Sequence, residues 1–334
     1  MILNIRFAEI VIIFKDKEVI LEFGNFVASG RLKYLYPIII SVLILWNCDN
    51  PVKINDFNED EAAYAFPAWS PDGEWIAIRW IGDPAIVPWN LCLIRPDGSD
   101  LRKFPNSENF GRIVDINWSP DSEWLAFTTL GWNVYKVKAN GDSLTQLTFT
   151  GDSPSCSWSY SDSIIAYYRM HSNNDSTGIW IMNKYGQNKS LISRHASHFD
   201  FSLGDSLFYE ISIGPDSAKM VFFFIPDSTE RIIYKWKRHD PYITYYYPDV
   251  SPDGKTIAFA IDDYIRTISA NGDNIKTLTA HRGVYPCWSP NGQQIVYCAY
   301  SSDPYGGVIR IMNADGSNNR ILTDCSELAY PDSL

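Results

Sequence analysis

A single pattern of polar turns and short apolar runs repeats along most of the chain. Each copy opens with a turn of the type Trp-Ser-Pro-Asp-Gly, and a short apolar run follows directly. A second apolar run leads into a second turn, often Asn-Gly or Asp-Gly, and a last short run closes the unit. Apolar runs of this length between turn residues predict β-strands. The opening turns are residues 69–73, 118–122, 158–162, 201–205, 250–254 and 288–292.

The second turn gives the length of the repeat. It ends at Gly98, Gly141, Gly186, Ser228, Gly272 and Gly316, which are 43, 45, 42, 44 and 44 residues apart. A period of forty-odd residues with four strands per unit is typical of β-propeller blades. The sequence therefore predicts an all-β fold, a six-bladed β-propeller of four-stranded antiparallel blades. Seven blades are the alternative, because residues 325–334 fit either a closing strand or the start of another blade.

Large and small apolar residues recur at fixed positions within the repeat. Tryptophan occupies one position in four units, where a large ring would fill the gap between blades, and alanine occupies another, where adjacent sheets would approach closely. The tryptophans are residues 69, 118, 158 and 288, and the alanines are residues 77, 126, 166 and 258. The fourth unit has Phe201 in place of the tryptophan, and we expect a divergent blade there. The five cysteines after Cys48 are expected to be small buried apolar residues.

These phrases resemble the propeller repeat of the TolB family. The family pattern reads P-x-W-S-P-D-G-x-x-I-A-F, then I-x-x-M-N-x-D-G, then L-T, and residues 284–323 match it best. The resemblance covers residues 64–323 and implies a propeller of the bacterial envelope that recognises a protein or peptide. Only about fifteen residues separate Cys48 from the first repeat, so we do not expect the α/β domain that precedes the propeller in TolB.

The first part of the chain has a different character. Residues 34–46 form a strongly apolar run of thirteen residues, short for a membrane span but suited to a signal peptide, and Arg31 and Lys33 precede it. The string Leu45-Trp46-Asn47-Cys48 resembles a bacterial lipoprotein signal, which implies lipid attachment at Cys48. An uncleaved anchor, an ordinary signal peptide and a buried strand are the alternatives. Residues 9–23 could form a hairpin around Lys15–Lys17.

Three segments follow from these observations. Residues 1–48 are an N-terminal extension with a signal or lipoprotein peptide, residues 49–63 are a linker, and residues 64–334 are the propeller. The expected location is the bacterial cell envelope, as a periplasmic or surface lipoprotein that contacts the membrane through its lipid anchor only.

Motifs of enzymatic chemistry are not found in the sequence. There is no Gly-x-Ser-x-Gly, His-Glu-x-x-His or Cys-x-x-Cys string. His195 and His198 have a spacing that could hold a metal, but a polar loop between blades is the simpler interpretation. We therefore predict no catalytic residue, no cofactor and no metal site. Some propeller lyases place histidine and metal at the channel mouth, which keeps a lyase interpretation open.

Charge and aromatic content indicate the kind of partner. The chain has 28 Lys and Arg against 39 Asp and Glu, a net charge of −11, which argues against nucleic-acid binding. Aromatic residues in long loops at the rim of a rigid scaffold suit the recognition of proteins or glycans, and Trp89, Tyr245 and Tyr246 are the candidates. The predicted function is a non-enzymatic envelope propeller that binds a protein or peptide. The alternative is a polysaccharide lyase or hydrolase acting at the channel mouth.

Overall fold

The computed structural model divides the chain into two units, Met1–Phe57 and Asn58–Leu334. In the first unit the structure describes four strands within residues 3–31. In the second unit it describes residues 63–81, 90–170, 176–194, 196–202, 204, 206–214, 217–237, 247–299 and 307–323.

The first unit contains an antiparallel meander. Its strands are β1 (Leu3–Phe7), β2 (Ile10–Lys15), β3 (Glu18–Phe23) and β4 (Phe26–Arg31), and each pairs with the next. Lys15 pairs with Glu18, so β2 and β3 form the hairpin expected within residues 9–23.

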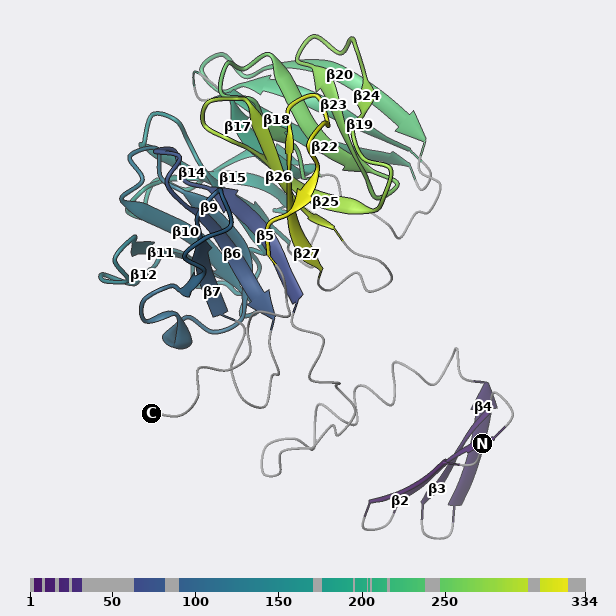
Figure 1. Cartoon of the computed structure of the whole chain (residues 1–334). Coiled ribbons are helices and arrows are strands. Elements are labelled where there is room, and N and C mark those ends of the chain that lie inside the picture. Colours follow the sequence, from purple (N-terminus) through teal and green to yellow (C-terminus); the bar gives the residue numbers. More distant parts are fainter. Residues whose placement is uncertain are drawn as a thin grey trace. The chain divides into compact units, whose positions relative to one another are not determined.

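The second unit consists of six antiparallel sheets, called blades 1 to 6, each made of four consecutive strands (Figure 1). Blade 1 contains β5 (Ala63–Trp69), β6 (Ile76–Ile81), β7 (Asn90–Ile94) and β8 (Arg102–Lys103). Blade 2 contains β9 (Ile113–Trp118), β10 (Trp124–Thr129), β11 (Val134–Lys138) and β12 (Thr145–Gln146). Blade 3 contains β13 (Ser155–Trp158), β14 (Ile164–Arg169), β15 (Gly178–Asn183) and β16 (Ser190–Arg194).

The remaining blades follow the same order. Blade 4 contains β17 (Ala196–Ser202), β18 (Ser206–Gly214), β19 (Ser217–Phe224) and β20 (Thr229–Lys237). Blade 5 contains β21 (Asp249–Val250), β22 (Thr256–Ile261), β23 (Tyr264–Ser269) and β24 (Lys276–Thr277). Blade 6 contains β25 (Gly283–Trp288), β26 (Gln294–Ala299), β27 (Val308–Asn313) and β28 (Arg320–Ile321). Among the described residues, the one helix is the short 3₁₀ turn Ser107–Asn109, and none is long and apolar enough to span a membrane.

The opening turn of each repeat is held by its own side chains. In blade 1 the Ser70 N–H donates to the Trp75 carbonyl (2.8 Å), and the Gly73 N–H donates to the Ser70 carbonyl (2.9 Å). The Asp72 carboxylate accepts from the Ser70 hydroxyl (2.6 Å) and from the Glu74 N–H (2.9 Å). The same contacts recur in blades 2 and 5, and in blade 6 with asparagine in place of the aspartate. The motif thus fixes the hairpin between the first two strands, as predicted.

The core lies between neighbouring blades. The four recurring alanines are fully buried, and the four recurring tryptophans are only 5–8% exposed, so their predicted packing role is confirmed. Blade 4 is complete although its sequence diverges, and Phe201 is buried at the tryptophan position. Its strands β18, β19 and β20 have eight or nine residues and are longer than those of other blades.

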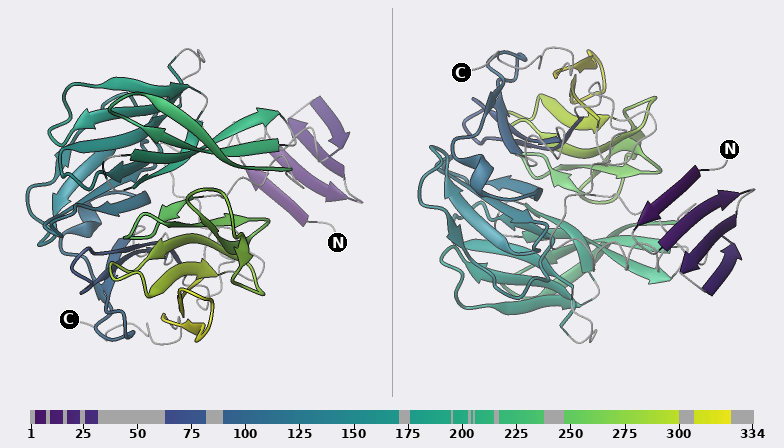
Figure 2. Two further views of the ribbon diagram at one scale, coloured as in Figure 1. Left: turned by 90° about the horizontal axis from the view of Figure 1, so that it is seen from above. Right: turned by 90° about the horizontal axis from the view of Figure 1, so that it is seen from below.

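The ring closes directly between the last blade and the first. Strand β5 contacts β25, β26 and β27, and one apolar cluster joins residues of both blades, among them Trp69, Ile78, Trp288 and Tyr297. Figure 2 shows the dark blue strands of blade 1 beside the yellow-green strands of blade 6. The prediction of six four-stranded blades is confirmed. Residues 325–334 lie outside the described residues.

Candidate functional site: the central channel

The first strands of the six blades surround two cavities that share a set of residues. One cavity, of about 280 Å³, lies toward the opening turns and is called the upper cavity. The other, of about 80 Å³, is called the lower cavity. The residues that border both lie directly before the tryptophan position of their blades. With Ser157 of blade 3, they form the middle ring, which consists of Ala68, Asn117, Ser157, Asp200, Asp249 and Cys287.

The middle ring links four of the six blades to the backbone of the next one. The first strand of a blade pairs with the second strand on one side only, which leaves backbone N–H groups along its inner edge to be satisfied. Middle-ring side chains accept hydrogen bonds from these groups. The pairs are Asn117 Oδ1 with the Trp158 N–H (3.0 Å), Asp200 Oδ2 with the Val250 N–H (3.3 Å), Asp249 Oδ2 with the Trp288 N–H, and Cys287 Sγ with the Trp69 N–H (3.3 Å). The last of these bonds joins blade 6 to blade 1. Cys287 therefore has a polar role and is only half-buried, unlike the buried apolar cysteine that we expected.

Two carboxyl groups of the middle ring lie against one another. Asp200 and Asp249 are hydrogen-bonded side chain to side chain, and Asp200 also accepts from the Ser157 hydroxyl (2.9 Å). Burial raises the pKa of both carboxyls, and the proximity of Asp200 raises the pKa of Asp249 further. Two carboxylates so close cannot both ionise easily, so the pair retains a proton at a higher pH than free aspartates do.

A third buried carboxyl borders the lower cavity. Asp115 of β9 accepts a hydrogen bond from the Cys156 N–H in the next blade (3.0 Å) and another from the Ile116 N–H (3.0 Å). Burial raises the pKa of Asp115 to about 7, the two hydrogen bonds oppose the shift, and the charge of Asp200 adds to it. The channel interior therefore changes charge near neutral pH.

Aromatic rings line the other side of the lower cavity. Phe66, Tyr247 and Tyr285 pack together, with ring centroids 4.1 Å apart for Phe66 and Tyr285 and 4.5 Å apart for the two tyrosines. The guanidinium of Arg79 lies 4.7 Å from the centre of the Phe66 ring and donates to the Ile113 carbonyl (3.1 Å). Burial lowers the pKa of Arg79 to about 10. Arg79 is thus a buried cation that ties blade 1 to blade 2.

His198 also borders the lower cavity, which corrects the expectation of a polar inter-blade loop. It lies in strand β17 at a bulge with φ +42°, its Nδ1 is 3.2 Å from a Glu210 oxygen, and its ring contacts Tyr247 edge-on. His195 lies outside the described residues. No cluster of three or more His, Cys, Asp or Glu with metal-binding geometry occurs in the part of the chain that the structure describes.

The upper cavity is lined mainly by apolar and aromatic groups. Its walls are formed by prolines of four opening turns, by tryptophan and tyrosine rings, and by the side chains of Ala68 and Val250. Asp200 and Asp249 lie at its floor. The proline and tyrosine residues are Pro71, Pro120, Tyr160, Pro252 and Pro290. Such a surface suits an apolar or aromatic side chain better than a charged one.

The other residues that the sequence singled out, Cys48, Trp89, Tyr245 and Tyr246, lie outside the described residues. Sequence reasoning also missed the middle ring. The signal was available, because its members are the residues directly before the tryptophan position in six aligned repeats.

Comparisons with known proteins identify the fold. No protein-family model matches the chain, and no curated protein matches it. The structure of a TolB-type protein from Agrobacterium tumefaciens aligns with a TM-score of 0.57 and 21% identity, covering 67% of this chain and 84% of that one. TolB from Acinetobacter baumannii aligns with a TM-score of 0.58 and 15% identity, covering 94% and 76%. An oligogalacturonate lyase from Vibrio parahaemolyticus aligns with a TM-score of 0.50 and 13% identity, covering 73% and 74%. The chain is thus a TolB-like β-propeller in fold.

Proposed function

We propose that the protein is a non-enzymatic propeller of the bacterial envelope that binds a protein or peptide at the upper cavity. The observation that carries this proposal is the lining of that cavity, where prolines and aromatic rings from several blades converge above a polar floor. A rigid ring presents these groups with little loss of conformational entropy on binding, which favours recognition of an extended segment.

The middle ring defines how deep a ligand would reach. Its acceptors are already used by the backbone N–H groups of the next blade, so few remain for a ligand. An apolar or aromatic side chain of a peptide would fill the upper cavity and stop at this floor. Aromatic anchors in desolvated pockets typically dominate the energy of such interfaces.

The remaining sequence predictions complete the proposal. Residues 1–48 carry an export signal with lipid attachment at Cys48, residues 49–63 link it to the propeller at 64–334, and the anchor holds the protein at the membrane. Trp89, Tyr245 and Tyr246 extend the binding surface on loops. The structural likeness to TolB supports an envelope location.

A polysaccharide lyase or hydrolase is the second candidate. The structural likeness to oligogalacturonate lyases, one of them solved in complex with manganese, favours it. The protonated Asp200–Asp249 pair could act as a general acid in a hydrolase if a glycan reached the channel floor.

Photo-crosslinking tests the proposal. A photoreactive phenylalanine replaces Tyr160, which borders the upper cavity and is 43% exposed, in the full chain. The matched control carries the same group at Phe149, which is 75% exposed and does not border the cavity. After irradiation with solubilised envelope, we expect one protein partner crosslinked from position 160 and not from 149. Equal crosslinking from both positions would contradict binding at the channel. Cleavage of an acidic polysaccharide by the purified chain, lost in Asp249→Asn, would favour the second candidate.

A further inference from the structure

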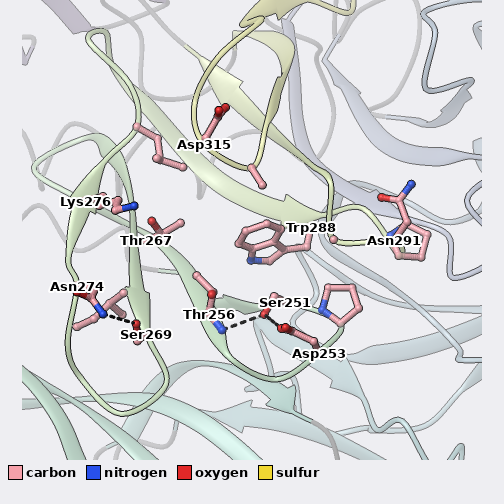
Figure 3. Close-up of a pocket in the computed structure, with 16 residues that line it drawn as sticks. Ser251, Asp253, Thr256, Thr267, Ser269, Asn274, Lys276, Trp288, Asn291 and Asp315 are labelled. Atoms are coloured by element: carbon pink, nitrogen blue, oxygen red, sulfur yellow. Dashed lines mark hydrogen bonds between the residues drawn. The ribbon is translucent and has the colours of Figure 1, made fainter.

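A large polar pocket lies between blades 5 and 6, outside the central channel. It has a volume of about 790 Å³, well within the range of small-molecule sites. Figure 3 shows its polar side chains gathered around Trp288. They include Thr256, Thr267, Lys276 and Asp315, and Ser251, Asp253, Ser269, Asn274 and Asn291 complete the polar lining.

Three bulky side chains that lie between blades 2 and 3 are replaced by smaller ones at this interface. Between blades 2 and 3, the corresponding space contains Trp124, Lys136 and Tyr185, with the Lys136 ammonium 4.7 Å from one ring centre and 5.2 Å from the other. The pairing registers and the repeat place Thr256, Thr267 and Asp315 at the equivalent positions of blades 5 and 6. Two threonines and an aspartate are much smaller than this stack.

Blade 1 fills the same space in another way. Trp75 stands at the position of Thr256, and the Arg95 and Arg102 guanidinium groups lie 3.8 and 4.1 Å from its ring centre. Arg102 is the equivalent of Lys276, since each pairs with the third strand at the same register. The Lys276 ammonium therefore stands where a cation covers a ring in blade 1, but here it faces an open pocket (Figure 3).

One buried donor in the pocket wall has no acceptor among the described residues. Trp288 is 7% exposed, and its indole Nε1–H is fully buried without an acceptor. Figure 3 shows this nitrogen on the side of the ring that faces Thr256 and Ser251. Thr267 is 6% exposed and its hydroxyl borders the pocket. Native proteins leave few buried donors unsatisfied, and a polar ligand would satisfy the Trp288 N–H.

We propose that this inter-blade pocket binds a short acidic sugar, with its carboxylate on Lys276 and its hydroxyl groups on Thr267, Trp288 and Asp315. Hydroxyl and amide side chains both donate and accept, as sugar hydroxyls do, and the Asp315 carboxylate accepts from them. Ile268, Leu278 and Trp288 supply apolar wall beside these polar groups. The protein carries a net charge of −11, so long-range attraction of an anion is excluded and the contact with Lys276 has to supply the recognition. This site is separate from the proposed protein-binding surface, and its failure would leave that proposal intact.

The experiment compares two probes that differ only in the carboxylate. The full chain is labelled with ¹⁵N at its tryptophan indoles, and the Trp288 signal is assigned by its loss in Trp288→Phe. D-glucuronate and D-glucose are then titrated separately. We expect glucuronate to shift the Trp288 indole signal, with glucose at least about tenfold weaker, which corresponds to roughly 1.4 kcal/mol for the ion pair.

Variants locate the binding. Lys276→Met should weaken glucuronate binding about tenfold, as expected for the loss of one ion pair. Thr267→Val keeps the shape of the side chain and should also weaken it, whereas Lys138→Met on blade 2 should leave it unchanged. Dispersed indole signals in each variant report that the fold is retained. An unmoved Trp288 signal, equal affinity for glucose, or an unchanged Lys276→Met would overturn the proposal. Equal binding of glutamate would overturn the assignment to a sugar.

Discussion

Asp115→Asn offers a direct test of the buried carboxyl in the channel. In the folded protein, burial raises the pKa of Asp115 from 3.8 to about 7, whereas the unfolded chain exposes the carboxyl to water. Between about pH 4 and pH 7 the folded protein therefore holds a proton that the unfolded chain has released. A group that binds its proton more tightly in the folded state loses stabilising effect as the pH rises through this window.

The structure gives the size of the effect. A shift of about three pKa units corresponds to about 4 kcal/mol, at about 1.4 kcal/mol per unit. Asp115 borders the lower cavity and is half-buried there, so solvent screening reduces this figure to about 2–4 kcal/mol. Asparagine does not titrate. The free energy of unfolding of wild type, minus that of Asp115→Asn, should therefore fall by about 2–4 kcal/mol from pH 4 to pH 8.

Urea unfolding followed by tryptophan fluorescence, at one-unit steps from pH 4 to pH 8, measures this difference. Groups that do not interact with Asp115 contribute equally to both proteins and cancel, and the interaction with Asp200 is part of the measured difference. Thr128→Val, a buried substitution that removes no titrating group, is the control and should follow wild type at a constant offset. If the curves of wild type and Asp115→Asn stay parallel across the whole range, the carboxyl does not titrate with a raised pKa and the reasoning is refuted.

Three further outcomes follow from the packing. Gly141→Ala should lower the thermal midpoint, because φ is +86° there and a Cβ would lie 2.6 Å from the Pro105 carbonyl oxygen; an unchanged midpoint would contradict this contact. Thr128→Val should cost about 1–3 kcal/mol in chemical unfolding, because the buried hydroxyl donates to the Pro154 carbonyl (2.8 Å). Thr256→Trp should restore the ring found in blades 1 and 2, remove the response to glucuronate and preserve the thermal midpoint; a retained response would place the ligand elsewhere.

The fold was predictable because each blade repeats the same local chemistry. The Ser-Pro-Asp-Gly turn specifies a hairpin through contacts within five residues, such as those of Ser70 and Asp72, and these contacts do not depend on the rest of the molecule. The number of blades follows from counting the turns. Even blade 4, with Phe201 in place of tryptophan, keeps the strand spacing and therefore its place in the ring.

The channel chemistry was less accessible because it depends on contacts between distant blades. Asp200 and Asp249 are 49 residues apart in the sequence and belong to different sheets, and only closure of the ring brings their carboxyls together. Their raised pKa values result from burial on an inner edge, which alternation of apolar and polar residues does not reveal. His198 was misjudged for the same reason, since the bulge that turns it toward the cavity is a property of the folded strand.

Equivalent positions of the six blades can nevertheless be compared with one another, so a residue that differs between blades is informative. Where a position only fills space, the blades agree, as at the buried alanines Ala77 and Ala126. Where the blades have different residues at one position, a structural requirement common to all blades does not explain the residue found in any one of them. Thr256 is at such a position, where blades 1 and 2 have tryptophan and blades 3 and 6 have Ile164 and Gln294, and it borders a pocket beside an indole N–H that has no acceptor among the described residues. The ring of Trp75 or Trp124 fills this space in two blades, and its absence at Thr256 leaves the open space in which we propose that blades 5 and 6 hold a ligand.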